Sequence, residues 1–324
     1  MRVGLVGCGR MGRKRATALG ADTLVGCVDD DPALARELAA GHGAQACDSL
    51  AGLLALRPDA VIVATTPNAL AAVGCSALTA GAHVLVEKPA GTCAADVTRL
   101  ERAAEQAGRH VRAGFNHRFH PGIARAVEEA SSGRFGPVLS LRGRYGHGGR
   151  PGYETEWRFD RAVAGGGQLV DQGMHLLDLA HWLLGPLPLH SSLLRSSYWP
   201  GEVEDTAVLL LGGVGRAGPF AALHASWAEW KNLFSLEIAC RSAKLQVDGL
   251  TGSYGAQRLT VYTMRPELGP PDVESVDYPA EDLSWALEWQ AFRDAVQAGA
   301  PPALASAGYA WAVIEDAYTR EPAA

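Results

Sequence analysis

The chain has 324 residues, of which 48% are hydrophobic and 20% charged, enough apolar sequence for the cores of about two globular domains. Its formal net charge of −6 argues against a nucleic-acid partner, because a surface that neutralises phosphates has to be basic. No stretch approaches the roughly 20 uninterrupted apolar residues of a membrane helix, and the N-terminal apolar run is too short for a signal peptide, so we expect a cytoplasmic protein without a membrane partner.

Neither the cysteines nor the histidines are spaced as metal ligands. The six cysteines include no Cys-x-x-Cys pair, and the ten histidines include no His-Glu-x-x-His motif. Most of the cysteines stand among small residues, which predicts buried small hydrophobes rather than disulfides. We therefore expect no metal site.

The first 115 residues alternate short apolar runs with segments of helical periodicity. The apolar runs predict strands at residues 2–6, 23–28, 60–64, 84–87 and 110–113. Helices are predicted between and after them, at residues 11–19, 32–40, 49–56, 69–80 and 94–106. A series of βαβ units of this kind forms a parallel sheet.

Residues 7–12 have the sequence GCGRMG and lie between the first predicted strand and the first predicted helix. In that position G-x-G-x-x-G is a dinucleotide fingerprint, in which two glycines allow the turn and the approach of a pyrophosphate and the third allows close helix packing. A merely glycine-rich turn is the less favoured alternative. The predicted cofactor contacts of this segment are Gly7, Gly9, Arg10, Met11 and Gly12.

Asp29 ends the second predicted strand, 22 residues after Gly7. An acid there can accept hydrogen bonds from the adenosine ribose hydroxyls, and with its acidic neighbours Asp30 and Asp31 it would repel a 2′-phosphate. We therefore expect NAD rather than NADP as the cofactor. For Asp31 we favour a simpler role, the capping of a helix that begins at Pro32.

Two further turns are predicted at the carboxyl edge of this sheet, where ligands of parallel sheets bind. One turn has the sequence ATTPN and the other EKP, and their predicted cofactor contacts are Thr65, Thr66, Pro67, Asn68, Glu87 and Lys88. Only four of the 29 basic residues are lysines. A lysine at this edge is therefore interpreted as a compact ammonium group that arginine cannot imitate.

After residue 115 the pattern changes. A helix at 121–131 and a strand at 138–145 are predicted before a glycine-rich segment that suggests a loop over a cleft. Adjacent antiparallel strands are predicted at 207–211, 220–226, 233–240, 245–247 and 259–262, and helices at 282–298 and 304–318. A broad sheet needs a cover, so we expect a homodimer or homotetramer.

Residues 165–178 have the sequence GGGQLVDQGMHLLD, in which the apolar residues recur at helical spacing from about Gly167 onwards. Asp171, His175 and Asp178 would then lie on one face of the helix. A solvated acid–histidine pair is the commoner meaning of such spacing, but the surrounding glycines would weaken a helix and need another reason, such as close approach to a ligand. This segment is interpreted as a site that handles protons.

These motifs, in this order, resemble the glucose–fructose oxidoreductase and inositol dehydrogenase (Gfo/Idh/MocA) family over essentially the whole chain. The resemblance implies an α/β fold with an N-terminal NAD-binding Rossmann domain, residues 1–118. It also implies a C-terminal α/β domain, residues 119–324, with a large open, mostly antiparallel sheet for substrate binding and oligomerisation. The catalytic residues it implies are Lys88, Asp171 and His175. One departure is Ala71, which stands where many members of the family have His.

A second group of residues is predicted to contact the substrate: Lys88, Asn116, Arg118, Tyr153, Trp157, Arg158, Asp171 and His175. Aromatic faces suit the C–H surfaces of sugar rings, and arginine and histidine suit hydroxyl groups. An interdomain structural role is the alternative for Asn116 and Arg118. For the residues at 153–158 the alternative is a packed aromatic–arginine cluster.

We therefore expect an NAD-dependent dehydrogenase that acts on a secondary alcohol of a sugar, cyclitol or amino-cyclitol. His175 would accept the hydroxyl proton because its intrinsic pKa is near neutral, Asp171 would orient it, and Lys88 would stabilise the alkoxide. Asp178 is better suited to anchoring the helix. Two alternatives stay open: glycoside cleavage through transient oxidation, and a non-enzymatic NAD-dependent sugar sensor.

Overall fold

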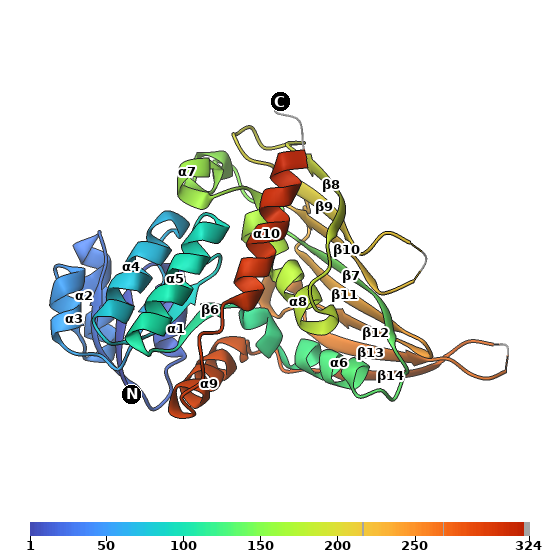
Figure 1. Ribbon diagram of the computed structural model, residues 1–324, viewed down its shortest axis with the longest axis horizontal. Coiled ribbons are helices and arrows are strands. Elements are labelled where there is room, and N and C mark those ends of the chain that lie inside the picture. The colour runs from blue at the N-terminus through green and yellow to red at the C-terminus, as the bar shows by residue number, and fades with distance from the viewer. Residues whose placement is uncertain (216, 268, 321–324) are drawn as a thin grey trace. The chain divides into compact units, whose positions relative to one another are not determined.

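The computed structural model describes residues 1–215, 217–267 and 269–320 (Figure 1). The chain divides into two compact units. Unit 1 contains Met1–Phe115, Ala162–Gly165 and Trp285–Gly308, and unit 2 contains Asn116–Arg161, Gly166–Ser284 and the segment from Tyr309 onwards. The boundary predicted at residue 118 lies close to the first crossing between the units, and the chain later returns to unit 1 twice.

Unit 1 is built on a parallel sheet with the strand order β3-β2-β1-β4-β5-β6. Its strands are β1 (Arg2–Val6), β2 (Thr23–Val28), β3 (Gln45–Ala46), β4 (Ala60–Val63), β5 (His83–Glu87) and β6 (Val111–Gly114). The strand order reverses between β1 and β4, and dinucleotides bind at such a switch point in doubly wound sheets. The predicted parallel sheet is confirmed, with the short strand β3 in addition.

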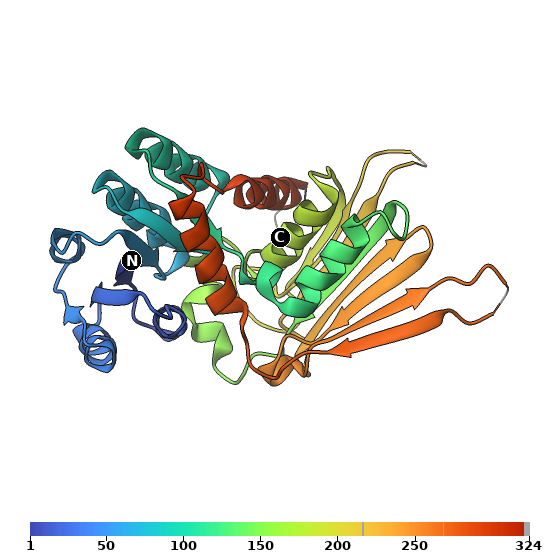
Figure 2. The ribbon, with the colours of Figure 1, turned by 90° about the horizontal axis from the view of Figure 1, so that it is seen from below.

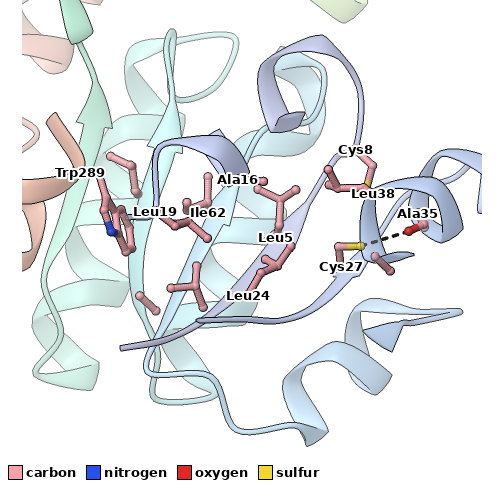
Figure 3. Packing of buried hydrophobic residues seen from close by; sticks show 14 of the residues in the cluster. Leu5, Cys8, Ala16, Leu19, Leu24, Cys27, Ala35, Leu38, Ile62 and Trp289 are labelled. Atoms are coloured by element: carbon pink, nitrogen blue, oxygen red, sulfur yellow. Dashed lines mark hydrogen bonds between the residues drawn. The ribbon is translucent and has the colours of Figure 1, made fainter. Parts of the chain in front are cut away.

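The helices of unit 1 follow the strands as predicted. They are α1 (Arg10–Thr17), α2 (Pro32–His42), α3 (Leu50–Ala55), α4 (Pro67–Thr79) and α5 (Ala94–Ala107), and most of α9 (Ser284–Gln297) also belongs to this unit. Strand residues Leu5, Leu24 and Ile62 pack in one core with Leu38 of α2 and Trp289 of α9 (Figure 3). The C-terminal helix α9 therefore completes the core of the N-terminal fold.

Unit 2 is built on a second sheet, with the order β14-β13-β12-β11-β7-β10-β9-β8. Its strands are β7 (Val138–Gly146), β8 (Leu189–Arg195), β9 (Thr206–Leu211), β10 (Phe220–Ser226), β11 (Leu233–Cys240), β12 (Ala243–Asp248), β13 (Arg258–Thr263) and β14 (Asp272–Asp277). Strands β7 and β10 pair in parallel, and the other neighbours in the described sheet pair antiparallel. The predicted open, mostly antiparallel sheet is confirmed, and β8 and β14 were not predicted.

Helices of unit 2 cover one face of this sheet. Helix α6 (Pro121–Ser131) packs on β11 to β13, and α8 (Met174–Leu184) packs on β7 and β10 (Figure 2). The remaining helical elements of the chain are α7 (Arg161–Ala164), α10 (Ala305–Arg320), the 3₁₀ turns η1 (Asn116–Phe119), η2 (Tyr153–Thr155), η3 (Trp157–Phe159) and η5 (Gly252–Tyr254), and the π-helical turn η4 (Leu169–Gly173). Side chains along β11 and β12 alternate between buried and half-exposed, as in a sheet with one covered face.

The described helices include none that is both long and apolar enough to span a membrane. Within the same residues, no three His, Cys, Asp or Glu side chains come together as a group that could hold a metal ion.

Candidate functional site

The glycine loop of unit 1 leaves open space at the start of α1. Gly7 has a φ of +91°, and a Cβ there would lie 2.5 Å from the carbonyl oxygen of Ala64. A Cβ on Gly12 would lie 1.9 Å from the carbonyl oxygen of Gly7, so the protein's own packing requires both glycines. A Cβ on Gly9 would meet none of the described atoms within 4 Å. Gly9 is also the N-cap of α1 and has no side chain to cap the first N–H groups, which leaves an opening suited to a pyrophosphate.

Asp29 is fixed beside this loop by two backbone N–H groups. Cys8 N–H donates to Asp29 Oδ2 over 2.6 Å, and Asp31 N–H donates to Asp29 Oδ1 over 2.8 Å. Each carboxylate oxygen can accept a further hydrogen bond, so both remain able to bind ribose hydroxyls. The Asp31 carboxylate caps α2 by accepting from Ala33 N–H, and the predicted capping role is confirmed.

The turn between β4 and α4 adjoins the glycine loop. A Cβ on Gly7 would come within 2.9 Å of Thr65 N, so the two turns touch at the carboxyl edge of the sheet. Thr66 is the N-cap of α4, Pro67 is its first residue, and Thr66 Oγ1 donates to Asn68 Oδ1 over 2.8 Å. The predicted residues of both turns are thus neighbours within unit 1. Ala71 is buried further along α4.

Glu87, which ends β5 just before Lys88, belongs to a buried charged cluster. Arg15 Nε donates to Glu87 Oε1 over 2.6 Å, and Arg15 Nη1 donates to Glu288 Oε2. All three side chains are buried in unit 1. We expected Glu87 to line the cofactor, but its carboxylate is engaged by Arg15. Its contribution is to fix the end of β5 from which half-buried Lys88 follows.

Asp171 and His175 lie on η4 and α8 of unit 2. The predicted helix is present but begins as a π-helical turn at Leu169, two residues after the expected start. Asp171 is half-exposed, with Oδ2 3.8 Å from Arg158 Nε. His175 is buried and stacks on His117, with ring centroids 3.8 Å apart.

The glycines before η4 have a different purpose from the one predicted. A Cβ on Gly166 would lie 2.1 Å from the Tyr318 hydroxyl oxygen, and a Cβ on Gly167 would lie 2.0 Å from the carbonyl oxygen of Glu204. The Tyr318 hydroxyl also donates to the buried carboxylate of Glu204 and accepts from Gly167 N–H. These two glycines therefore make room for the protein's own groups rather than for a ligand.

Asn116 and Arg118 have structural roles within unit 2. Both oxygens of the buried Asp178 accept hydrogen bonds from Arg118, at 2.8 and 2.6 Å. This bidentate pair confirms Asp178 as the anchor of α8 and occupies the Arg118 guanidinium. Asn116 is buried and donates to Ser284 Oγ over 2.9 Å. We had predicted both residues to contact the substrate, with an interdomain structural role as the alternative; these contacts lie within unit 2, and the substrate contact stays a prediction.

The residues at 153–158 divide into a packed part and an accessible part. Tyr153 is buried in a hydrophobic cluster of mostly aromatic side chains, whose other members are Phe159, Trp199, Val203 and Trp227. Trp157, by contrast, is 39% exposed, and the Arg158 guanidinium lies 4.5 Å from its ring centroid. Trp157 and Arg158 thus remain accessible beside Asp171. Tyr153 matches the packed-cluster alternative.

Several residues near His175 were not predicted. Tyr145, at the end of β7, and His117 face the His175 ring, and Gln172 donates to the Tyr254 hydroxyl over 2.9 Å. Polar residues in an otherwise apolar helix, such as Gln172, were the only sequence signal for this group. Lys88 belongs to unit 1, whereas Asp171 and His175 belong to unit 2.

Two family models match the chain. Residues 1–115 match the model described as an oxidoreductase family with an NAD-binding Rossmann fold, and residues 123–246 match the GFO/IDH/MocA C-terminal domain. Together the two models span most of the sequence.

Two curated relatives carry the names of sugar and cyclitol dehydrogenases. Levoglucosan dehydrogenase of Pseudarthrobacter phenanthrenivorans is 29% identical over 240 residues, which cover 68% of this chain and 61% of the relative. Inositol 2-dehydrogenase 2 of Saccharopolyspora erythraea is 30% identical over 226 residues, covering 65% and 62%. The match therefore spans about six-tenths of the length of these relatives.

Solved structures match nearly the whole chain. GenD2 from gentamicin A biosynthesis, in complex with NAD, has a TM-score of 0.83 and 26% identity, covering 98% of this chain and 93% of that one. Levoglucosan dehydrogenase in complex with NADH has a TM-score of 0.85 at 21% identity, covering 98% and 97%, which is a likeness of fold.

Proposed function

Because the chain belongs to the Gfo/Idh/MocA oxidoreductase family, we propose that it transfers a hydride between NAD and a secondary alcohol of a sugar, cyclitol or amino-cyclitol. The observation that carries the proposal is the η4–α8 element, which holds half-exposed Asp171 one turn before His175 in a chain whose other unit is an NAD-binding fold. A cytoplasmic location remains a prediction from the sequence.

Oxidation of an alcohol requires the carbon to lose a hydride and the hydroxyl to lose a proton. Bound NAD would supply the hydride acceptor. We assign the proton to His175, whose imidazole can accept it near neutral pH. Asp171 would orient the hydroxyl and favour the imidazolium, and the Lys88 ammonium would stabilise the developing alkoxide. In the reduction of a ketone the same groups act in reverse.

The accessible groups beside Asp171 suit a hydroxyl-rich substrate. The exposed indole of Trp157 offers an apolar face for the C–H surface of a ring. The Arg158 guanidinium lies over that indole, 3.8 Å from Asp171, and donates to Glu156 over 2.8 Å, so both donors and acceptors lie near the indole. The names of the relatives, which include levoglucosan and inositol dehydrogenases, support the same substrate class.

The test is a substrate screen with the purified chain. NAD is mixed with levoglucosan, inositols, glucosides or amino-cyclitols, and the absorbance of reduced nicotinamide is followed. We expect NADH to accumulate with at least one polyhydroxylated compound. Glycoside cleavage without net NADH would support transient oxidation instead. Tighter NAD binding with a sugar but no turnover would support a sensor.

We expect NAD to bind about tenfold or more better than NADP, because Asp29 would repel the 2′-phosphate. Asp29→Ala should narrow this difference, and calorimetric titration of both cofactors measures it. The matched control is Asp31→Ala, which loses the cap of α2 and about 1 kcal/mol of stability but should narrow the difference less. Equal affinities in the unmutated protein would contradict the assignment of Asp29 to the ribose.

A second copy of the chain is the proposed cover for the open face of the unit 2 sheet. Leu193, Val208, Leu210 and Phe220 are between 37% and 47% exposed on the neighbouring strands β8, β9 and β10. Leu193 pairs with Val208 across β8 and β9, so their side chains are adjacent. An exposed apolar group of this kind marks an interaction surface.

We therefore predict a homodimer or homotetramer that Leu210→Asp dissociates, since the substitution places a charge within the apolar group. Light scattering after size exclusion should show that the mass of the variant is lower than that of the unmutated protein: a monomer if that protein is a dimer, and a dimer or monomer if it is a tetramer. Val214→Asp, in an exposed loop, makes the same chemical change and should leave the mass unaltered. An unmutated protein that is already monomeric at micromolar concentration would contradict the prediction.

A further inference from the structure

The imidazole of His175 lies against a second imidazole within unit 2. The rings of His117, from η1, and His175, from α8, are stacked with centroids 3.8 Å apart and planes inclined by 25°. Both side chains are buried. One face of the His175 ring is therefore covered by a group that can itself carry a charge.

A directed chain of hydrogen bonds fixes the proton on His117. The carboxylate of Asp282 can only accept, so Ser284 Oγ donates to it over 2.6 Å. Having used its one proton, Ser284 Oγ accepts from Asn116 Nδ2 over 2.9 Å. This orients the Asn116 amide with Oδ1 towards His117, 3.2 Å from Nδ1. The proton in that bond must therefore lie on His117 Nδ1.

The direction of this chain decides how His117 can act on its neighbour. Every bond donates towards the Asp282 carboxylate, and bonds in such a series polarise one another. A His117 ring that carries its proton on Nδ1 alone is neutral, and these bonds make it more electron-rich. A neutral aromatic face stabilises a cation placed over it. A proton taken up by His175 would put a cation there.

We propose that His117 is a positioning residue for His175: it fixes the plane of that ring and stabilises the imidazolium formed when the substrate hydroxyl gives up its proton. The inference rests on the proposed function. The proton passes from the alcohol oxygen to His175 and the hydride from the adjacent carbon to NAD, so His117 neither gains nor loses a proton.

The other groups around the histidine pair are consistent with this role. Burial holds the pKa of Tyr145, on β7, well above its usual value, so the phenol stays neutral. Arg118 and Asp178 neutralise each other in a bidentate pair. His120 lies edge-on to His117, with Nε2 4.0 Å from the Asp282 carboxylate.

Two further acidic or weakly acidic groups lie nearby. Asp171 lies on η4, immediately before α8, and Tyr254 of η5 lies against Tyr145. Among the described groups, the face of His117 lies against the His175 ring and Asp171 lies one turn before it, so both can stabilise a cation on His175.

The experiment compares His117→Ala and His117→Phe in the full chain. We expect His117→Ala to lower kcat by about tenfold with little change in KM, and to move the acid limb of the pH profile of kcat to lower pH by about half a unit or more. His117→Phe keeps an aromatic face, so its kcat and the acid limb of its pH profile should lie close to those of the unmutated protein. The matched control is His181→Ala. It removes a histidine that lies on α8, the helix of His175, and stacks on Tyr309 with ring centroids 4.7 Å apart, so it should leave kcat and the pH profile nearly unchanged.

A second readout does not depend on activity. Histidine-selective NMR titration of the unliganded protein follows His175 directly, and its midpoint should fall in His117→Ala and recover in His117→Phe. An unmoved or raised midpoint in a variant with a normal unfolding temperature would overturn the inference. If the alanine variant does not fold, a His117→Phe midpoint far below that of the unmutated protein would overturn it. Retained turnover in His175→Ala would instead refute the proposed base and leave the NMR result to decide the stacking claim.

Discussion

His175→Ala and Lys88→Ala are each expected to lower kcat by a factor on the order of 10² or more, as the loss of an acid–base group or of a charge stabiliser does. NAD binding should survive both changes, because the glycine loop and Asp29 are expected to hold the dinucleotide. Lys88→Arg should also have a strongly lowered kcat, since guanidinium is bulkier than ammonium and does not give up its proton. Steady-state kinetics on an identified substrate, together with NAD titration of each variant, measure these effects.

The control for the lysine is Lys231→Ala, an exposed lysine between β10 and β11, which should retain normal turnover. Near-normal turnover in His175→Ala would show that another residue accepts the proton, with Asp171 and Lys88 as the next candidates. Near-normal turnover in the alanine variants of Lys88, Asp171 and His175 would show that these residues are not catalytic and have only a structural role.

Arg15→Met is expected to cost about 3–5 kcal/mol of the free energy of unfolding, because it leaves the carboxylates of Glu87 and Glu288 buried without their cation. Urea denaturation measures the loss. The matched control lies on the same helix: Arg13 pairs with Glu37 over 2.7 Å at the surface, where water screens the pair, so Arg13→Met should cost much less than Arg15→Met. Equal losses in the two variants would contradict the argument.

The pH dependence of this loss has a definite sign. Burial raises the pKa of the Glu288 carboxyl above its usual value, and removing Arg15 raises it further. A folded state with the higher carboxyl pKa holds its proton more tightly than the unfolded state, so its stability grows as the pH falls. The deficit of Arg15→Met should therefore be smaller near pH 5 than near pH 8.

The sequence predicted the parallel sheet well because its strands are buried on both faces and appear as continuous apolar runs. Strand β4 is buried at all four positions, for example. Strand β3 has only two residues, too few for any pattern. Strand β14 is exposed at every position, so it has no apolar face to reveal it.

The candidate site was predictable only where its signal is local. Asp171 and His175 follow from their spacing on one element. Their partners do not, because His117 lies 58 residues before His175 and pairs with it only through the fold. The same applies to Gly167. A Cβ at this position would collide with the backbone of Glu204, which is distant in sequence, so no local pattern predicts that glycine is required there.

The cluster of Arg15 with Glu288 also sets an order of events during synthesis. These two residues are 273 positions apart, and the core around Leu5 and Ile62 is completed by Trp289 of α9. A ribosome therefore releases the glycine loop, its strands and Glu87 long before the chain can supply Glu288, the second carboxylate that pairs with Arg15, and the helix that closes that core. Contacts of such long range form late, so the core of the N-terminal fold is completed only after α9 has been synthesised.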